Sequence, residues 1–189
     1  MVLTESRIKL KTGDQALAFS LAGVDGKTYS LADFSSYQGM LIIFMCNHCP
    51  YVQAKIEAIN ELQEKFGDQI AIVGINSNDP DYPGEGMNNM KKFAAERGIK
   101  FSYLFDENQK VARNYGATCT PDPFLFGREG KLVFHGRIND AMEPGDPITE
   151  KTMADNIEKL LTGRKIENDF QPSIGCSIKW LKWISAIDT

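Results

Sequence analysis

The feature that most constrains the fold is a Cys-x-x-Cys motif between a run of apolar residues and an amphipathic segment. Met40–Phe44 precedes Cys46 and Cys49, and Pro50 follows the second cysteine. The next apolar residues recur every three or four positions, as on one face of a helix: Val52, Ile56, Ile59, Leu62 and Phe66. Two intervening residues let the sulfurs close a small ring, and a helix N-terminus supplies partial positive charge that favours a thiolate. The motif therefore predicts thiol–disulfide chemistry where a buried strand meets a helix.

The apolar pattern along the rest of the chain alternates strands with helices. Strands are predicted at 40–45, 70–75, 101–105, 124–126 and 132–137, and a hairpin at 18–31 around an Asp-Gly turn. Helices are predicted from residue 50 to a stop at Gly67, and at 87–97, 107–115 and 148–161. This order predicts an α/β fold with a central mixed β-sheet, helices on both faces and an N-terminal β-hairpin extension.

Composition narrows the function and the cellular compartment. The chain has 189 residues and a formal net charge of −4, which gives no basic footprint for nucleic acid and no polybasic patch for a membrane. The N-terminal residues lack the apolar run of a secretory signal, so we expect a cytoplasmic protein. Four cysteines are too few for a disulfide-stapled fold, and in a reducing compartment they indicate catalysis or metal binding.

The chain is expected to form one domain with a distinct C-terminal tail. The domain is predicted at residues 1–165 and the tail at 166–189. The tail is apolar and contains Cys176, Trp180 and Trp183. We therefore expect it to pack on the body of the protein or on a second subunit of a homodimer.

Three separate stretches, in the correct order, carry a resemblance to a known family. They read Phe-Met-Cys-Asn-His-Cys-Pro-Tyr-Val at 44–52, Tyr-Gly-Ala-Thr-Cys-Thr-Pro-Asp at 115–122 and Pro-Ser-Ile-Gly-Cys-Ser-Ile-Lys-Trp at 172–180. Over residues 10–162 the chain resembles the thioredoxin superfamily. More closely, it resembles the peroxiredoxin-like branch of the AhpC/TSA group, the alkyl hydroperoxide reductases and thiol-specific antioxidants. The resemblance implies a thioredoxin-like fold and an antioxidant or redox role that needs no cofactor.

The resemblance also implies roles for individual residues. Pro121 would be the cis-proline that faces the dithiol, which would leave the backbone of Thr120 free to pair with a substrate peptide. Cys46 would be the exposed attacking thiolate of low pKa, and Cys49 the buried thiol that releases the mixed disulfide. His48 precedes the second cysteine, where a histidine can stabilise the thiolate. The leading hypothesis is a thiol–disulfide oxidoreductase that acts on thiol or disulfide proteins and uses a thiol reductant.

A second hypothesis keeps the enzyme but changes the reaction. Cys49 would attack a small peroxide, and Cys46 or Cys119 would resolve the resulting sulfenic acid. Cys119 lies two residues before Pro121, which suits either a third redox thiol or a small buried residue that fills space. Aligning Cys49 with the peroxide-reacting cysteine of peroxiredoxins places Ile42 and Cys46 where that pattern has Pro and Thr or Ser. The hydroxyl that would orient a peroxide is therefore missing from position 46.

A third hypothesis is a metal-binding module. Cys46, Cys49, His48 and His135 would hold Cu(I) or Zn²⁺, because both ions accept thiolate and imidazole ligands. Against this, the sequence has one Cys-x-x-Cys pair, so no metal site is predicted as the leading assignment. His135 is otherwise interpreted as a structural strand residue. Cys176 is interpreted as a buried cysteine, with a resolving or intersubunit thiol as the alternative.

Overall fold

The large sheet contains the predicted strands. The computed structural model describes residues 3–182, and within them eight strands form this sheet: β2 (Ser20–Gly23), β3 (Thr28–Ser30), β4 (Gly39–Phe44), β5 (Ile70–Asn76), β6 (Ser102–Phe105), β8 (Asp122–Gly127), β9 (Leu132–Gly136) and β10 (Phe170–Gln171). Their spatial order is β10-β9-β8-β4-β5-β6-β2-β3. The strands β4, β5 and β6 are parallel, whereas β8 runs antiparallel to β4. The prediction of a mixed sheet is confirmed.

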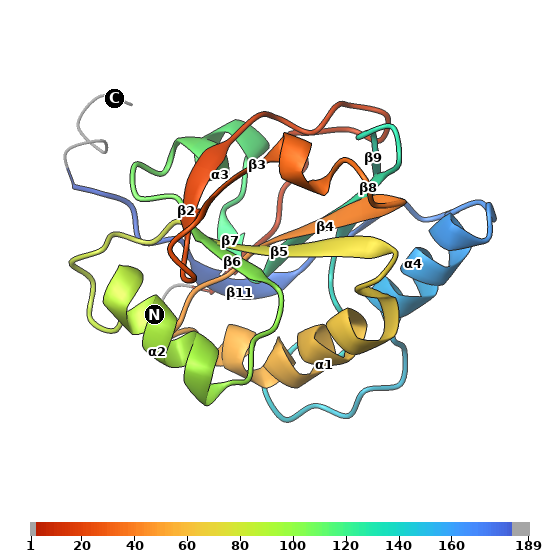
Figure 1. The fold of residues 1–189 in the computed structure, drawn as a ribbon. Helices are drawn as coiled ribbons and strands as arrows, with labels where there is room; N and C mark the ends of the chain where they lie inside the picture. The colour runs from red at the N-terminus through yellow and green to blue at the C-terminus, as the bar shows by residue number, and fades with distance from the viewer. Residues whose placement is uncertain (1–2, 183–189) are drawn as a thin grey trace.

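Helices cover both faces of this sheet. They are α1 (Pro50–Phe66), α2 (Met87–Glu96), α3 (Lys110–Tyr115) and α4 (Thr152–Leu161). Figure 1 shows α1, α2 and α4 on one face of the sheet and α3 on the other. Among the described residues, none of the helices combines the length and the apolar character that a bilayer crossing requires.

Strand β4 is buried from both sides, and this fixes the start of the Cys-x-x-Cys motif. Successive strand residues point to opposite faces of a sheet. Leu41 and Ile43 accordingly pack in the cluster formed with α1, α2 and α4, whereas Ile42 and Phe44 pack in the cluster that contains α3. The residues that follow β4 therefore leave a rigid, fully packed strand.

The N-terminal hairpin forms where the sequence predicts it. Strands β2 and β3 pair antiparallel, and the turn between them contains Gly26 with φ +85°. Glycine adopts this conformation without a Cβ penalty. The Asp25 carboxylate accepts the Lys27 N–H at 3.1 Å, which fixes the turn. The hairpin joins the sheet through β2, which pairs antiparallel with β6.

Two helices begin later than predicted, and a carboxylate binds backbone N–H groups near the start of each. Helix α4 starts at Thr152 instead of residue 148, since the Asp140 carboxylate accepts the N–H groups of Thr149 and Glu150 at 2.9 Å each. Helix α3 starts at Lys110 instead of residue 107. The Asp106 carboxylate accepts the Ala112 N–H at 2.9 Å and so caps this helix from outside.

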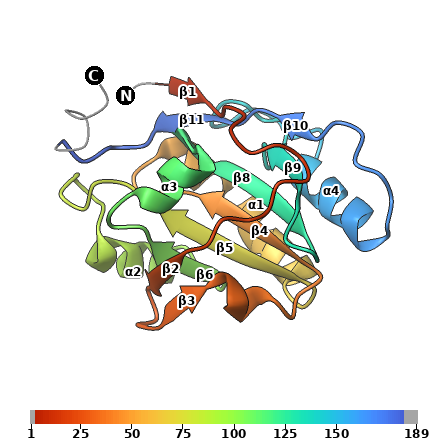
Figure 2. The same ribbon diagram turned by 90° about the horizontal axis from the view of Figure 1, so that it is seen from above.

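A small second sheet ties the tail to the body. It consists, within the described residues, of β1 (Leu3–Glu5), β11 (Ile174–Ser177) and β7 (Cys119–Thr120), in the order β1-β11-β7 with both pairs antiparallel. Figure 2 shows β1 and β11 side by side at one edge of the molecule. The described part of the tail lies against its own chain, whereas Trp183 falls outside the described residues.

Candidate active site

The two cysteines of the motif lie at the junction of β4 and α1. Cys46 follows the strand, Cys49 occupies the N-cap position of α1, and Pro50 is the first helical residue. Proline suits this position because its missing N–H would have no partner in the first turn. Both cysteines are fully buried. All four cysteines of the chain lie within the described residues, and none of them forms a disulfide.

The residue before a cis-proline faces both sulfurs. The Thr120-Pro121 peptide bond is cis, as the resemblance implied. The Thr120 hydroxyl lies 3.2 Å from Cys46 Sγ, and the Thr120 carbonyl oxygen lies 3.3 Å from Cys49 Sγ. Thr120 therefore contacts both sulfurs of the motif.

The pKa shifts favour a thiolate on Cys49, whereas the resemblance places it on Cys46. A hydrogen bond from the Cys46 thiol, opposed by burial and assisted by Cys176 and the Val52 N–H, lowers the pKa of Cys49 to about 5. Burial, the hydrogen bond with Cys49 and the Glu85 carboxylate raise the pKa of Cys46 well above its usual range. The hydrogen-bond donors around Cys49 at the helix N-terminus favour a negative charge on its sulfur. Cys46 is also buried, not exposed as predicted.

His48 points to a carboxylate. Its Nδ1 is hydrogen-bonded to Glu85, whose side chain is completely buried. Glu85 also accepts the backbone N–H groups of Asn47 and His48 at 3.2 Å each and the Asn76 side-chain amide at 2.6 Å. Sequence reasoning missed Glu85, which lies 37 residues from His48 in a loop between two glycines. The role of His48 in stabilising a thiolate stays a prediction.

Cys119 and Cys176 differ in what their sulfurs contact. The Cys119 thiol donates to the Pro121 carbonyl at 3.8 Å, and burial raises its pKa. Cys176 Sγ instead lies 2.8 Å from Cys49 Sγ. Burial and the contact with Cys49 raise the pKa of Cys176 to about 12, so Cys176 keeps its proton beside Cys49 at neutral pH. The cysteine from the tail, not Cys119, is the third thiol against the dithiol.

The edge predicted to bind a substrate peptide is occupied by the chain itself. Strand β11 pairs antiparallel with β7, with Cys176 opposite Thr120 and Ser177 opposite Cys119. The prediction that the Thr120 backbone is free to pair with a substrate is therefore wrong for this structure. The physical reason is the tail, whose strand provides the same main-chain partners that a peptide would provide.

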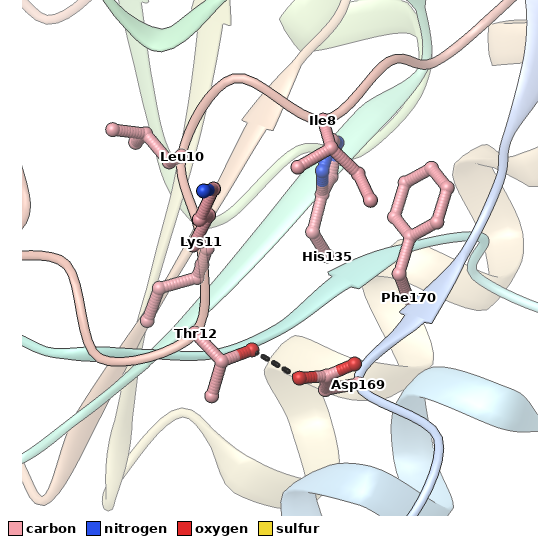
Figure 3. Close-up of a pocket in the computed structure, with 8 residues that line it drawn as sticks. Ile8, Leu10, Lys11, Thr12, His135, Asp169 and Phe170 are labelled. Carbon is pink, nitrogen blue, oxygen red and sulfur yellow. Dashed lines mark hydrogen bonds between the residues drawn. The ribbon is translucent and has the colours of Figure 1, made fainter.

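His135 is not brought to the dithiol, which removes it from the predicted metal set. Its Nε2 is hydrogen-bonded to Asp122 at 2.7 Å, and its ring stacks on Phe124 with centroids 3.9 Å apart. Figure 3 shows His135 beside a cavity of about 130 Å³ that Lys11 and Phe170 also line. The interpretation of His135 as a structural strand residue agrees with these contacts.

A smaller set of metal-ligand types does surround the first cysteine. Within the described residues, ligand atoms of Cys46, His48 and Glu85 lie within 4.8 Å of one another. The Glu85 oxygens already accept three N–H groups and the His48 ring. These bonds compete with any ion, so the geometry favours a hydrogen-bonded network at this place over a metal centre.

Comparisons with known proteins show what the chain is similar to. The sequence pattern of the AhpC/TSA family matches residues 12–135. A thiol-disulfide oxidoreductase ResA from Bacillus thuringiensis (strain Al Hakam) is 26% identical over 66% of this chain and 69% of the relative. Peroxiredoxin Q, chloroplastic, from Populus jackii is 28% identical over 64% of this chain and 54% of the relative. A crystal structure of an uncharacterized conserved protein from Geobacillus kaustophilus superposes with TM-score 0.89 and 40% identity, covering 96% of this chain and 98% of that one.

Proposed function

The chain belongs to the AhpC/TSA family, and on this premise we propose that Cys46 and Cys49 form its two-electron redox centre. Like its named relatives, the chain is an oxidoreductase of the thioredoxin fold. The observation that carries the proposal is that both motif sulfurs, at the N-terminus of α1, lie against Thr120, the residue before the cis bond to Pro121: Cys46 Sγ is 3.2 Å from its hydroxyl and Cys49 Sγ is 3.3 Å from its carbonyl oxygen.

Thiol–disulfide exchange follows from this geometry. The Cys49 thiolate attacks one sulfur of a disulfide substrate, forming a mixed disulfide and releasing one substrate thiol. Cys46 then attacks Cys49 Sγ, so the Cys46–Cys49 disulfide forms and the second substrate thiol leaves. The dithiol loses two electrons and two protons, and the substrate disulfide gains them. A thiol reductant, supplied by the cell, closes the cycle in our proposal.

The burial of the site favours small substrates over proteins. Cys46 and Cys49 have no exposed surface, and β11 occupies the main-chain edge at Thr120. A protein disulfide would have to displace this strand, whereas a small disulfide or hydroperoxide needs only a local opening. We therefore propose a small disulfide or hydroperoxide as the substrate.

Comparison of two disulfides tests this proposal. The reduced protein is mixed with oxidised glutathione or with insulin, and the loss of protein thiols is followed over time. We expect faster oxidation by the small disulfide, and trapping of a Cys46–Cys49 disulfide in mass spectrometry. Equal or faster reaction with insulin would contradict the small-substrate proposal. Absence of the Cys46–Cys49 disulfide would contradict the redox centre itself.

A peroxidase activity is the second candidate, because the thiolate is on Cys49. That sulfur would attack the distal oxygen of a hydroperoxide, releasing an alcohol or water and leaving a sulfenic acid. Cys46 would then form the disulfide and release water. Single-turnover consumption of hydrogen peroxide tests this reaction. We expect Cys46→Ser to retain one turnover and Cys49→Ser to lose it, and retention by Cys49→Ser would contradict the assignment.

The cellular setting stays a proposal drawn from the sequence. We propose a cytoplasmic location, supported by the sparse cysteines. The sequence predicts that the tail packs either on the body of the protein or on a second subunit of a homodimer. The described part of the tail packs on its own chain. Light scattering of the purified protein tests the dimer.

A further inference from the structure

We propose that Cys176 is a third redox thiol, which takes over the disulfide from Cys46 by exchange at Cys49 Sγ. This inference rests on the proposed redox chemistry of Cys46 and Cys49 and adds a residue to it. The Sγ atoms of Cys49 and Cys176 are 2.8 Å apart, although the two residues are separated by 127 positions in the sequence. A disulfide bond is about 2.04 Å long, so a small approach of the two sulfurs completes the bond.

The fold places Cys176 there through a close approach of two backbones. A Cβ added to Gly175 would lie 2.0 Å from the Thr120 carbonyl oxygen, so this position accepts no side chain while β11 keeps its place on β7. Glycine therefore lets the tail reach the strand before the cis-proline. The next residue, Cys176, stands opposite Thr120, the residue that contacts both motif cysteines.

Bonds on both sides of Cys176 hold the tail in this position. Before it, the Ser173 N–H donates to the Ser6 hydroxyl at 2.8 Å, and the Ser6 N–H donates to the Ser173 carbonyl at 2.9 Å. After it, the Gln109 side-chain amide donates to the Lys179 carbonyl and accepts the Leu181 N–H, each at 2.8 Å. The thiol is thus held at Cys49 before any reaction, which removes most of the entropic cost of meeting it.

The exchange balances without another reactant. The Cys176 sulfur attacks Cys49 Sγ of the Cys46–Cys49 disulfide. The Cys49–Cys176 bond forms, the Cys46–Cys49 bond breaks, and the electron pair leaves on Cys46, which takes the proton of Cys176. The protein keeps one disulfide and two thiols, so nothing is oxidised or reduced overall.

Oxidation of the motif also makes Cys176 a better nucleophile. Burial, the hydrogen bond with Cys49 and the charge of Cys49 raise the pKa of Cys176. The last two effects disappear when Cys49 enters a disulfide, whereas Lys179, which lowers this pKa, stays in place. The thiolate of Cys176 therefore becomes accessible in the state in which the exchange needs it.

Disulfide mapping at equilibrium tests the inference. The protein is held in glutathione redox buffers and quenched with acid, and its remaining thiols are alkylated before digestion and mass spectrometry. In the unmodified protein we expect both disulfides, with Cys49–Cys176 at about one tenth or more of Cys46–Cys49. We expect Cys46→Ser to form Cys49–Cys176, and Cys176→Ser to form Cys46–Cys49 alone.

Two further variants separate a placed thiol from chance contact. Gly175→Ala displaces β11 and should reduce the Cys49–Cys176 share by about tenfold or more, while Cys46–Cys49 still forms. Cys119→Ser should leave the Cys49–Cys176 share unchanged, because the Cys119 thiol faces the Pro121 carbonyl. Circular dichroism confirms that each variant is folded.

The outcomes distinguish this inference from the function on which it rests. A Cys46–Cys49 disulfide without any Cys49–Cys176 disulfide, in the unmodified protein and in Cys46→Ser, overturns the third thiol and leaves the redox centre intact. If Gly175→Ala does not change the share of the Cys49–Cys176 disulfide, the close approach of β11 to β7 does not place Cys176 at Cys49. Absence of both disulfides under oxidising conditions overturns the inference and the proposed function together.

Discussion

Two walls of the same site shift the pKa values of its two sulfurs in opposite directions. The wall formed by the loop before α2 brings the buried Glu85 carboxylate near Cys46, and this charge contributes with burial to the raised pKa of that thiol. The wall formed by the tail brings Cys176 against Cys49, and its thiol helps to lower the pKa of Cys49 to about 5. The difference teaches that the surroundings, not the motif alone, decide which cysteine of a Cys-x-x-Cys pair is the nucleophile.

The largest expected effect comes from replacing each cysteine of the motif separately by serine, because the two variants should differ strongly in their rate of oxidation. Cys49→Ser removes the thiolate, so we expect the first-turnover oxidation rate to fall by more than about a hundredfold. Cys46→Ser leaves that thiolate in place and should keep most of this first step. Stopped-flow measurement of protein thiol oxidation by a small disulfide checks both variants. A larger loss of oxidation rate in Cys46→Ser than in Cys49→Ser would show that Cys46 is the nucleophile.

The low pKa of Cys49 should also appear as a pH dependence of stability. The folded pKa of about 5 lies below the usual thiol range, so between about pH 5 and 8.5 the unfolded state binds more protons than the folded state. The free energy of unfolding of the reduced protein should therefore rise with pH across this window by about 4–5 kcal/mol, and this contribution is lost as the pH falls through 5.

Urea unfolding at several pH values measures this effect, with Cys49→Ala as the matched variant. The difference in free energy of unfolding between the reduced protein and Cys49→Ala isolates the contribution of this thiol from other titrating groups. A difference that stays constant from pH 5 to 8 would show that Cys49 is not the thiolate.

Removal of the Glu85 charge tests the other wall. In a Cys49→Ser background, Glu85→Gln should lower the pKa of Cys46, because one of the causes that raise it is lost. Glu85 accepts hydrogen bonds from N–H groups such as those of Asn47 and Asn76, and the amide of glutamine would point an N–H donor at one of these donors. We therefore expect a stability loss of about 1–3 kcal/mol. The pH profile of Cys46 alkylation and urea unfolding measure the two effects. Glu57→Gln, an exposed change on α1, is the control, and equal profiles for both variants would remove Glu85 from the electrostatics of the site.

The sequence predicts the local half of this site and misses the other half, for a physical reason. Cys46, Cys49 and Pro50 lie within one strand-to-helix junction, so apolar periodicity and turn chemistry locate them. The central sheet is predicted in the same way. Glu85 contacts His48 from 37 positions away and Cys176 contacts Cys49 from 127 positions away, and no short-range pattern records such contacts.

The strands that pair next to the tail or within it are also too short to be predicted. Strands β7 and β10 have two residues each and β1 has three, which is less than the period-2 signal needs. One local signal was present in the tail, where Gly175 precedes Cys176 and permits the approach to Thr120. A glycine beside a cysteine has this meaning only when the opposing backbone is known.

The smallest expected effect is the change in the pKa of Cys49 when the thiol of Cys176 is removed from the tail. Cys176→Ala removes one hydrogen-bond donor to the Cys49 thiolate while the donors from Cys46 and Val52 stay. A single hydrogen bond to a charged group suggests that the pKa of Cys49 rises by about one pH unit. Ultraviolet absorbance of the thiolate, titrated in the reduced protein, measures it.

Cys119→Ala is the matched control for this titration, because it removes a buried thiol whose hydrogen bond goes to the Pro121 carbonyl. Its titration midpoint should equal that of the unmodified protein. Cys176→Ser should fall between the two, since a hydroxyl can still donate to the thiolate. Equal midpoints for Cys176→Ala and Cys119→Ala would mean that the tail positions Cys176 without stabilising the charge, and that α1 and Cys46 alone hold the thiolate on Cys49.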